Sequence, residues 1–293
     1  MGNEKLILSI DIGGTKIYSA KINKEGKIVG EVEKNKTPKT SKEIFNILSE
    51  IIKKSENEVD GVSIATAGAV NNENSKVISA TGNLPSGYRD IEFSSLSKKP
   101  VFVENDANCA SYAEFKIGSA KGFLNSITIT LGTGVGGGII VDGKLLKGKS
   151  GSAGEMHFKM STLKKRKCTC GAWDCFEIYT SGKGLTITAK EITGDDLTTY
   201  DIVELLKKGD KKALTVINQW EEDIIAGFIG LGNIFDPDCI VLSGSMAEFV
   251  DTEKIEKRVN SEISTQPLKV LKASAGNYSG MIGAALLAFD KLK

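Results

Sequence analysis

The start of the chain alternates short apolar runs with polar turns, a pattern typical of buried strands. Three such runs, bounded by turns that contain glycine, predict successive strands at residues 5–10, 16–22 and 27–34. A different spacing follows them. Apolar residues recur every three or four positions from Ser41 to Lys54, which predicts a helix that Thr40 or Ser41 caps.

The rest of the chain continues both patterns. Apolar runs predict strands at 59–65, 100–104, 126–131, 139–141 and 239–242, and helical spacing predicts helices at 107–115, 211–235 and 280–292. The order of strand, glycine-containing turn and strand occurs near residues 6–22 and again near residues 126–141. We interpret this order as an internal repeat, with one copy in each of two α/β lobes.

Composition and charge exclude several classes of protein. The 293 residues include 38 Lys and Arg against 37 Asp and Glu, so the net charge of +1 creates no global field for nucleic acid or an anionic membrane. No apolar stretch approaches the roughly 18 residues of a membrane span, and no signal pattern precedes Asp11. Three of the five cysteines lie between positions 168 and 175, unlike a secreted disulfide framework. We therefore expect a cytoplasmic protein.

The first glycine turn carries chemistry suited to phosphate. It reads Asp11-Ile12-Gly13-Gly14-Thr15-Lys16, directly after an apolar run. Glycines without Cβ atoms let backbone N–H groups approach a phosphate, while Thr15 adds a hydroxyl donor and Lys16 a positive charge. Asp11 suits a hydrated Mg²⁺ that bridges to nucleotide phosphates. The alternative is an ordinary hairpin turn, and this motif alone does not decide between the two.

The second glycine turn, Gly132-Thr133-Gly134-Val135-Gly136-Gly137, superficially matches a dinucleotide-binding fingerprint. That fingerprint requires a helix after the glycines, so that the helix N-terminus meets the pyrophosphate. Here the β-rich run 139–141 and an Asp-Gly turn follow instead. The sequence therefore predicts a strand–turn–strand phosphate clamp in which Gly132, Thr133 and Gly134 take part.

Asn105 and Asp106 lie where a strand ends, a common position for sites in α/β proteins. A sugar hydroxyl loses its proton as it attacks a γ-phosphorus, and a carboxylate such as Asp106 can accept that proton. Asn105 offers donor and acceptor atoms for neighbouring hydroxyls. The alternative is that the pair only caps the helix that follows.

Cys168, Cys170 and Cys175 predict a metal site, with the only histidine of the chain, His157, as the fourth ligand. Three thiolates and an imidazole make a closed tetrahedral zinc site, which is structural rather than catalytic. A zinc-ribbon DNA module is the alternative, but it usually needs two knuckles and a basic surface. Only residues 164–167 are basic here, so we discount it.

Two glutamates flank this cysteine segment. Glu155 precedes it and Glu177 follows Cys175 by two positions. Ionised carboxylates accept two or more hydrogen bonds, so both residues suit sugar hydroxyls. The alternative for each is a solvated surface glutamate.

Taken together, these motifs resemble the ROK family of bacterial sugar kinases, within the actin-like and hexokinase-like ATPase superfamily. The resemblance extends over nearly the whole chain. It implies an α/β, two-lobed actin-like ATPase (ribonuclease H-like) fold with a ligand cleft between the lobes. A small lobe would comprise residues 1–117 with the C-terminal helix 280–293. A large lobe would comprise residues 118–293, with the zinc-binding segment 157–175 embedded in it.

The resemblance also implies residue roles. Asp106 would be the catalytic base, and the turns 13–16 and 132–134 would bind ATP phosphates, with Gly244 near the adenosine. Tyr88 replaces a tryptophan that is frequent in relatives, on a loop of the small lobe near the sugar. The sugar would contact Asn83, Asn105, Asp106, Glu155, His157 and Glu177.

Two departures from the family pattern bear on these roles. The family has Glu-x-Gly-His, whereas this chain has Glu155-Met156-His157-Phe158 without the glycine. A one-residue deletion makes His157 the zinc ligand, whereas a gapless match places Phe158 there. We favour the deletion, because phenylalanine cannot bind a metal and all three thiols are present. Ser243-Gly244-Ser245 replaces consecutive glycines, which could alter the fit of the nucleotide.

The resulting expectation is an ATP- and Mg²⁺-dependent hexose kinase with a structural Zn²⁺, acting on the 6-hydroxyl of glucose. N-acetylmannosamine, N-acetylglucosamine, mannose and fructose are alternative substrates. The family also includes sugar-responsive repressors, which carry a helix-turn-helix domain ahead of the first glycine turn. Only ten residues precede Asp11 here and Asp106 is present, so we expect an enzyme rather than a sugar sensor. We expect a homodimer, as in many relatives, that contacts neither nucleic acid nor membrane.

Overall fold

The computed structural model describes residues 4–79 and 84–292. The chain divides into two compact units. Unit 1 comprises Met1–Leu124, Gly138–Gly154 and Ala273–Lys293, and unit 2 comprises Asn125–Gly137 and Glu155–Lys272. The expected small lobe comprised residues 1–117 and 280–293. Unit 1 instead extends to Leu124, includes the hairpin segment 138–154 and resumes at Ala273. Strand β9 (Val135–Val141) carries the chain from unit 2 to unit 1.

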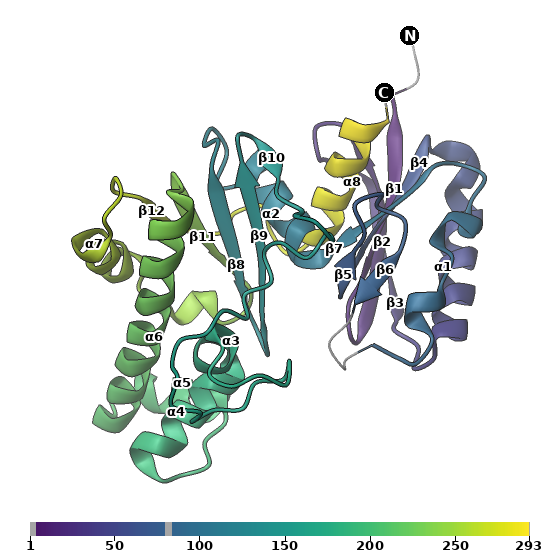
Figure 1. Ribbon diagram of the computed structural model, residues 1–293. Coiled ribbons are helices and arrows are strands. Elements are labelled where there is room, and N and C mark those ends of the chain that lie inside the picture. The colour runs from purple at the N-terminus through teal and green to yellow at the C-terminus, as the bar shows by residue number, and fades with distance from the viewer. Residues whose placement is uncertain (1–3, 80–83, 293) are drawn as a thin grey trace. The chain divides into compact units, whose positions relative to one another are not determined.

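Unit 1 is built on a five-stranded sheet in the order β3-β2-β1-β4-β7 (Figure 1). The first three strands form an antiparallel meander, whereas β4 and β7 run parallel to β1. A separate two-stranded sheet pairs β5 with β6. The strands are β1 (Leu6–Ile12), β2 (Lys16–Asn23), β3 (Ile28–Lys36), β4 (Gly61–Thr66), β5 (Ala69–Val70), β6 (Val77–Ser79) and β7 (Val101–Asn105).

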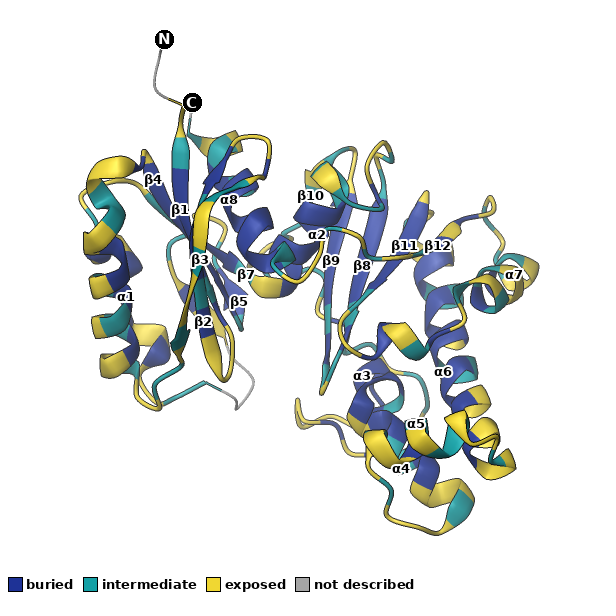
Figure 2. Ribbon diagram, turned by 180° about the vertical axis from the view of Figure 1, so that it is seen from behind, coloured by how far each residue is buried: buried dark blue, intermediate teal, exposed yellow. Residues whose placement is uncertain are grey.

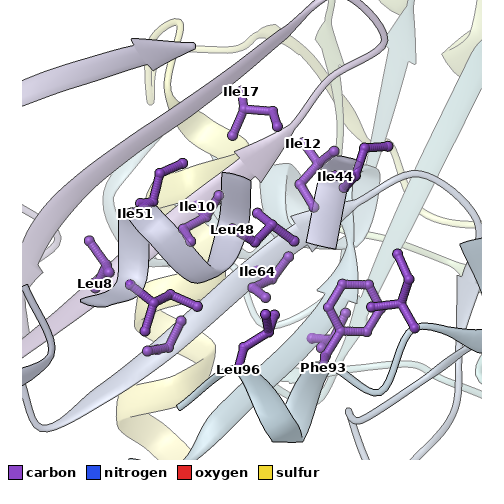
Figure 3. Close-up of a cluster of buried hydrophobic side chains, with 14 of the residues drawn as sticks. Leu8, Ile10, Ile12, Ile17, Ile44, Leu48, Ile51, Ile64, Phe93 and Leu96 are labelled. Atoms are coloured by element: carbon purple, nitrogen blue, oxygen red, sulfur yellow. The ribbon is translucent and has the colours of Figure 1, made fainter. Parts of the chain in front are cut away.

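Helix α1 (Ser41–Ser55) packs on one face of this sheet, with its apolar side buried and its polar side exposed (Figure 2). Thr40 caps it by accepting a hydrogen bond from the N–H of Glu43. Its buried residues meet those of β1 and β4, as Figure 3 shows for Ile44, Leu48 and Ile64. Each such side chain contributes about 1.5–3 kcal/mol, so packing rather than propensity holds the helix.

Helices α2 (Asp106–Ile117) and α8 (Ser279–Lys291) pack against each other and contribute to a second core cluster with β1 and β2. They lie close because α8 has a glycine at the contact. A Cβ atom on Gly283 would lie 1.7 Å from the carbonyl oxygen of Cys109. This contact sets α8 beside α2, the helix that begins at Asp106.

The second sheet has the order β10-β9-β8-β11-β12. Its strands are β8 (Ser126–Leu131), β9, β10 (Lys144–Leu145), β11 (Cys239–Ser243) and β12 (Lys269–Lys272). The order matches that of the first sheet, with β8 in the place of β1 and β9 in the place of β2. The internal repeat is therefore confirmed at the level of topology, and each copy places a glycine turn between its first two strands.

The helices of unit 2 are α3 (Phe176–Thr180), α4 (Gly182–Thr193), α5 (Thr199–Lys207), α6 (Lys211–Phe235) and α7 (Thr252–Glu262). Trp220 on α6 is fully buried, and its indole N–H donates to the carbonyl oxygen of Thr180, 2.9 Å away. This bond joins α6 to the end of α3. Among the described residues, no helix has the length and apolar character that crossing a membrane requires.

One strand begins earlier than expected. The run 134–138 reads as a glycine loop, yet β9 starts at Val135. Within unit 1, a Cβ atom on Gly138 would lie 2.5 Å from the Cβ atom of Ser111. Glycine at 138 lets the strand pass close to α2. The turn comprises residues 132–134, where the Gly132 N–H donates to the Gly134 oxygen.

Candidate functional site

The glycine turn of unit 1 joins β1 to β2. The Gly13 N–H donates to the carbonyl oxygen of Lys16, 3.0 Å away, and closes the turn. From the end of β3, Thr37 donates its hydroxyl to the Gly13 oxygen and its N–H to the Thr15 oxygen. Gly13, Gly14, Thr15 and Lys16 are all exposed. The turn thus has a fixed shape and presents its surface to solvent, as a phosphate-binding turn requires.

Asp11 and Asp106 lie close enough for their charges to interact. Burial first, and the charge of Asp106 second, raise the pKa of Asp11 to about 7. Asp11 also lies at the N-terminus of α8, where a Cβ atom on Gly280 would be 2.7 Å from Asp11 Oδ2. A helix N-terminus favours negative charge, which eases the cost of holding two carboxylates together. Pairs of carboxylates with perturbed pKa values are typical of functional sites.

Asn105 is the N-cap of α2. Its Oδ1 accepts from the N–H groups of Ala107 and Asn108, at 2.9 and 3.0 Å, and its Nδ2 donates to the carbonyl oxygen of Gly68, at 3.0 Å. Asn105 therefore caps the helix, and this does not exclude a contact with a ligand. Because an amide nitrogen carries two hydrogens, one still remains for a ligand.

Asp106 is the first residue of α2, and it is exposed. Its Oδ1 accepts from the N–H of Ala107 at 2.9 Å, and Oδ2 has no hydrogen-bond donor in the part of the chain described. Desolvation by the surrounding protein raises the pKa of Asp106, and the Ala107 amide partly opposes that rise. A carboxylate with a raised pKa and a free oxygen suits the acceptance of a proton.

The glycine turn of unit 2 lies at the end of β8. The Gly132 N–H donates to the Gly134 oxygen at 3.0 Å, and the Gly132 oxygen accepts from the N–H of Gly182, at the start of α4, at 2.8 Å. Thr133 is exposed. Gly244 adopts φ +86°, and its Cβ atom would lie 2.3 Å from the carbonyl oxygen of Leu131. Only glycine fits there, and Gly244 therefore lies beside the turn.

Glu177 is buried, so the surface-glutamate alternative is wrong for this residue, whereas Glu155 is exposed. The Oε2 atom of Glu177 accepts from the N–H of Val135 at 3.2 Å. Its Oε1 accepts from the Thr169 hydroxyl and lies 3.5 Å from Cys168 Sγ. Glu177 thus joins the glycine turn of unit 2 to the cysteine segment.

The structure brings together the four predicted metal ligands. The ligand atoms of His157, Cys168, Cys170 and Cys175 all lie within 4.8 Å of one another. Cys170 Sγ lies 3.5 Å from Cys175 Sγ, and Cys168 Sγ lies 3.8 Å from His157 Nδ1. Zinc distances of 2.0–2.3 Å in a tetrahedron place two ligand atoms roughly 3.3–3.8 Å apart. The donor set and its spacing fit a Cys₃His zinc site.

The structure also distinguishes the two alignments around the missing glycine. Phe158 stacks on Phe176, with ring centroids 4.9 Å apart, and its carbonyl oxygen accepts from the Phe176 N–H at 2.8 Å. His157, rather than Phe158, faces the thiols, as the one-residue deletion predicts. His157 Nε2 lies 3.5 Å from Glu155 Oε2, in the arrangement usual for a metal-bound imidazole.

Two further residues belong to the loop that was expected near the sugar. Asn83 lies outside the described residues. Tyr88 is buried in unit 1, with its hydroxyl 2.7 Å from Thr66 Oγ1, and the charge of Asp106 is among the causes, after burial, that raise its pKa. Sequence reasoning missed Gly280, whose contact with Asp11 carries no local signal because the two are far apart in the chain.

A cavity of about 480 Å³ in unit 2 is lined by none of the predicted site residues. Its polar lining includes Arg166, Glu191, Gln219 and Asp223. Arg166 binds Glu191 through Nε and Nη2, and its guanidinium lies 4.4 Å over the ring of Tyr179. Burial raises the pKa of Asp223 from 3.8 to about 6, although Arg166 opposes the rise.

Asp223→Asn is expected to stabilise the protein at pH 8 and to have little effect at pH 4. The folded state binds a proton at Asp223 more tightly than the unfolded chain does, so stability falls as pH rises from 3.8 through about 6. Above about pH 6, the charged Asp223 lowers the free energy of unfolding by up to roughly 3 kcal/mol, and asparagine removes this loss. Thermal melts at both pH values test this, with exposed Asp195→Asn as the control. A variant whose advantage does not grow with pH would contradict it.

Two like sheets, each with a glycine turn between its first two strands, define the actin-like ATPase fold, and this fold class is as expected. The sequence model of the ROK family matches residues 7–291, and the chain belongs to this family. The chain is 32% identical to a glucokinase of Streptomyces coelicolor, over 97% of both chains. It is 31% identical to an N-acetyl-D-glucosamine kinase of Haemophilus influenzae, over 96% of this chain and 99% of that one.

Among solved structures, the chain is similar to a ROK family glucokinase from Streptomyces griseus in complex with glucose and AMPPNP. The two are 30% identical with a TM-score of 0.79, and the match covers 97% of this chain and 99% of the other. The similarity therefore extends over both units.

Proposed function

We propose that the protein is an ATP-dependent hexose kinase that phosphorylates glucose at the 6-hydroxyl. The observation that carries this proposal is Asp106, which begins α2 with one carboxylate oxygen free and a raised pKa. Glycine turns at equivalent places in both sheets supply phosphate-binding backbone. The related Streptomyces griseus glucokinase with glucose and AMPPNP supports the sugar and the nucleotide.

In the proposed reaction, Asp106 accepts the proton of the sugar 6-hydroxyl as that oxygen attacks the γ-phosphorus of ATP. The bond between the γ-phosphorus and the bridging oxygen breaks, and ADP leaves with the electron pair. N–H groups of the turns 13–16 and 132–134 bind the phosphates, with Thr15, Lys16 and Thr133 as side-chain donors. Gly244 leaves room for the adenosine. Asp11 orients the Mg²⁺ that accompanies ATP as part of the substrate.

The sugar is held by hydrogen bonds that fix the 6-hydroxyl relative to Asp106. Asn105 has one amide hydrogen left for this purpose. Glu155, His157 and Glu177 are the further proposed contacts, together with Asn83. Fixing the hydroxyl removes the entropy cost of bringing the reactants together, which is a large part of what such enzymes supply.

His157, Cys168, Cys170 and Cys175 are the proposed ligands of a structural Zn²⁺. When bound, this ion supplies cross-links within a segment that has little regular structure. The same segment leads into Glu177, so its order bears on sugar binding.

The identity of the sugar rests on similarity alone. The glucokinase and the N-acetylglucosamine kinase are almost equally similar to this chain. We therefore propose glucose first, and an N-acetylhexosamine, mannose or fructose as the alternative.

The test is ADP release from purified protein with ATP, Mg²⁺ and a panel of hexoses and N-acetylhexosamines. We expect one sugar to give turnover far above the others, and Asp106→Asn assayed in parallel controls for a contaminating kinase. Turnover highest with an N-acetylhexosamine would replace glucose as the substrate. Sugar binding in a thermal shift assay without turnover on any sugar would overturn the kinase assignment in favour of a sugar sensor.

A further inference from the structure

Glu104 is a buried carboxylate directly before Asn105 and Asp106, and the proposed mechanism does not use it. It lies in β7 and is 3% exposed. Four donors surround its two oxygens. Oε1 accepts from the N–H of Asn105 at 2.9 Å and from Asn108 Nδ2 at 3.1 Å, and Oε2 accepts from Asn74 Nδ2 and Lys147 Nζ, each at 2.7 Å.

The two contacts of Oε1 lie on either side of Asp106 along the chain. One fixes the amide immediately before α2, and the other holds a side chain in the first turn of the helix. A change in the Glu104 carboxylate would therefore shift the backbone that carries Asp106. Displacements of about 1 Å at a reacting group can reduce turnover by about 10²-fold.

Lys147 forms an ion pair with this buried carboxylate, and Lys291, whose Nζ donates to Asn74 Oδ1, is a second cation near it. The Lys147 side chain is 15% exposed, and its Nζ also donates to the carbonyl oxygen of Asn71 at 2.9 Å. Lys147 begins the loop that leads into Glu155, and its own carbonyl oxygen accepts from the N–H of Ala153 at 3.1 Å. The ion pair therefore joins the start of α2 to the loop before a proposed sugar contact.

We propose that Glu104 and Lys147 form a positioning ion pair for the phosphoryl transfer. The pair holds Asn105 and Asp106 in their reactive orientation and ties them to the loop 147–154. The inference rests on the proposed kinase function, since it concerns the same site. Buried ion pairs add little net stability compared with apolar residues of the same volume, so a role in orientation accounts for this one better than stability does.

The test uses Lys147→Met, which removes the charge and keeps the aliphatic stem. We expect kcat to fall about tenfold or more, while KM for MgATP stays within about twofold, because the phosphate turns do not depend on this pair. Lys147→Arg can still donate to both Glu104 and Asn71, and we expect it to restore kcat to within about threefold of wild type. Lys149→Met removes an exposed lysine of the same loop and serves as the matched control.

A purely structural role predicts a different result. Folded Lys147→Met with a lower melting temperature but a kcat within about twofold of wild type would overturn the proposal. If Lys147→Met does not fold, the double variant Glu104→Gln/Lys147→Met, which removes both charges of the pair, takes its place. We expect the same loss of kcat from the double variant, and a normal kcat would overturn the proposal. Wild-type protein without turnover on any sugar would overturn the kinase function itself.

Discussion

Replacing Asp106 with asparagine is expected to lower kcat by about 10²-fold or more and to leave the sugar dissociation constant nearly unchanged. Asparagine has nearly the same shape, and its Oδ1 can still accept from the Ala107 N–H, so α2 should begin in the same place. The amide cannot accept the proton of the attacking hydroxyl. Turnover is measured by ADP release, and sugar binding by calorimetry.

Asp90→Asn, at an exposed aspartate of the same unit, is the control for this variant and should keep wild-type turnover. A near-normal kcat for Asp106→Asn would remove Asp106 from the mechanism. The pH dependence gives a second readout, because the base must be deprotonated to act. Since the pKa of Asp106 is raised, kcat/KM should fall on acidification at a higher pH than for an ordinary aspartate.

Features that depend on neighbours along the chain were predictable from the sequence. The apolar spacing gave β8 at Ser126–Leu131 and α6 at Lys211–Phe235 with their observed bounds. The glycine turns are also local, since a turn is decided by a few adjacent residues. The helix after Asn105 was expected from Ala107, one residue later than its observed start at Asp106. The order of these features along the chain was enough to indicate the family.

Features that depend on distant segments were not predictable in the same way. Glu104 draws its donors from β7 itself, α2, the segment before β6 and the loop after β10. No spacing in the sequence brings Asn74 and Lys147 to the same carboxylate. The same holds for the close contact of Gly138 with Ser111, two residues far apart in the chain.

His157 is an intermediate case. Three cysteines and one histidine were evident in the sequence, but two alignments remained for the fourth ligand. The stacking of Phe158 on Phe176 settles which of the two side chains faces the thiols, and this packing arises only when α3 folds against the cysteine segment. The residue types alone indicated His157 or Phe158 at this position, and the tertiary packing shows that it is His157.

Loss of the metal site is expected to have the second large effect. Cys175→Ser should abolish zinc binding, lower the melting temperature by about 5 °C and raise KM for the sugar. Regular pairing within the cysteine segment is limited to isolated bridges, Lys159 with Cys175 and Lys167 with Trp173, so a bound ion would supply most of its order. A loss of roughly 3 kcal/mol corresponds to such a shift for a protein of this size.

The sugar KM should change because Glu177 depends on that segment. The Oε1 atom of Glu177 contacts Thr169 and Cys168, and Oε2 accepts from the Val135 N–H. Disorder of the cysteine segment would remove the contacts of Oε1, so the carboxylate could leave its position. KM for MgATP should stay near the wild-type value, which separates a local effect from partial unfolding. Cys239→Ala, at a buried cysteine of β11 outside the cluster, is the control and should keep one zinc per chain by elemental analysis. Wild-type protein that contains no zinc, or Cys175→Ser protein that keeps it, would show that these four residues do not form the metal site.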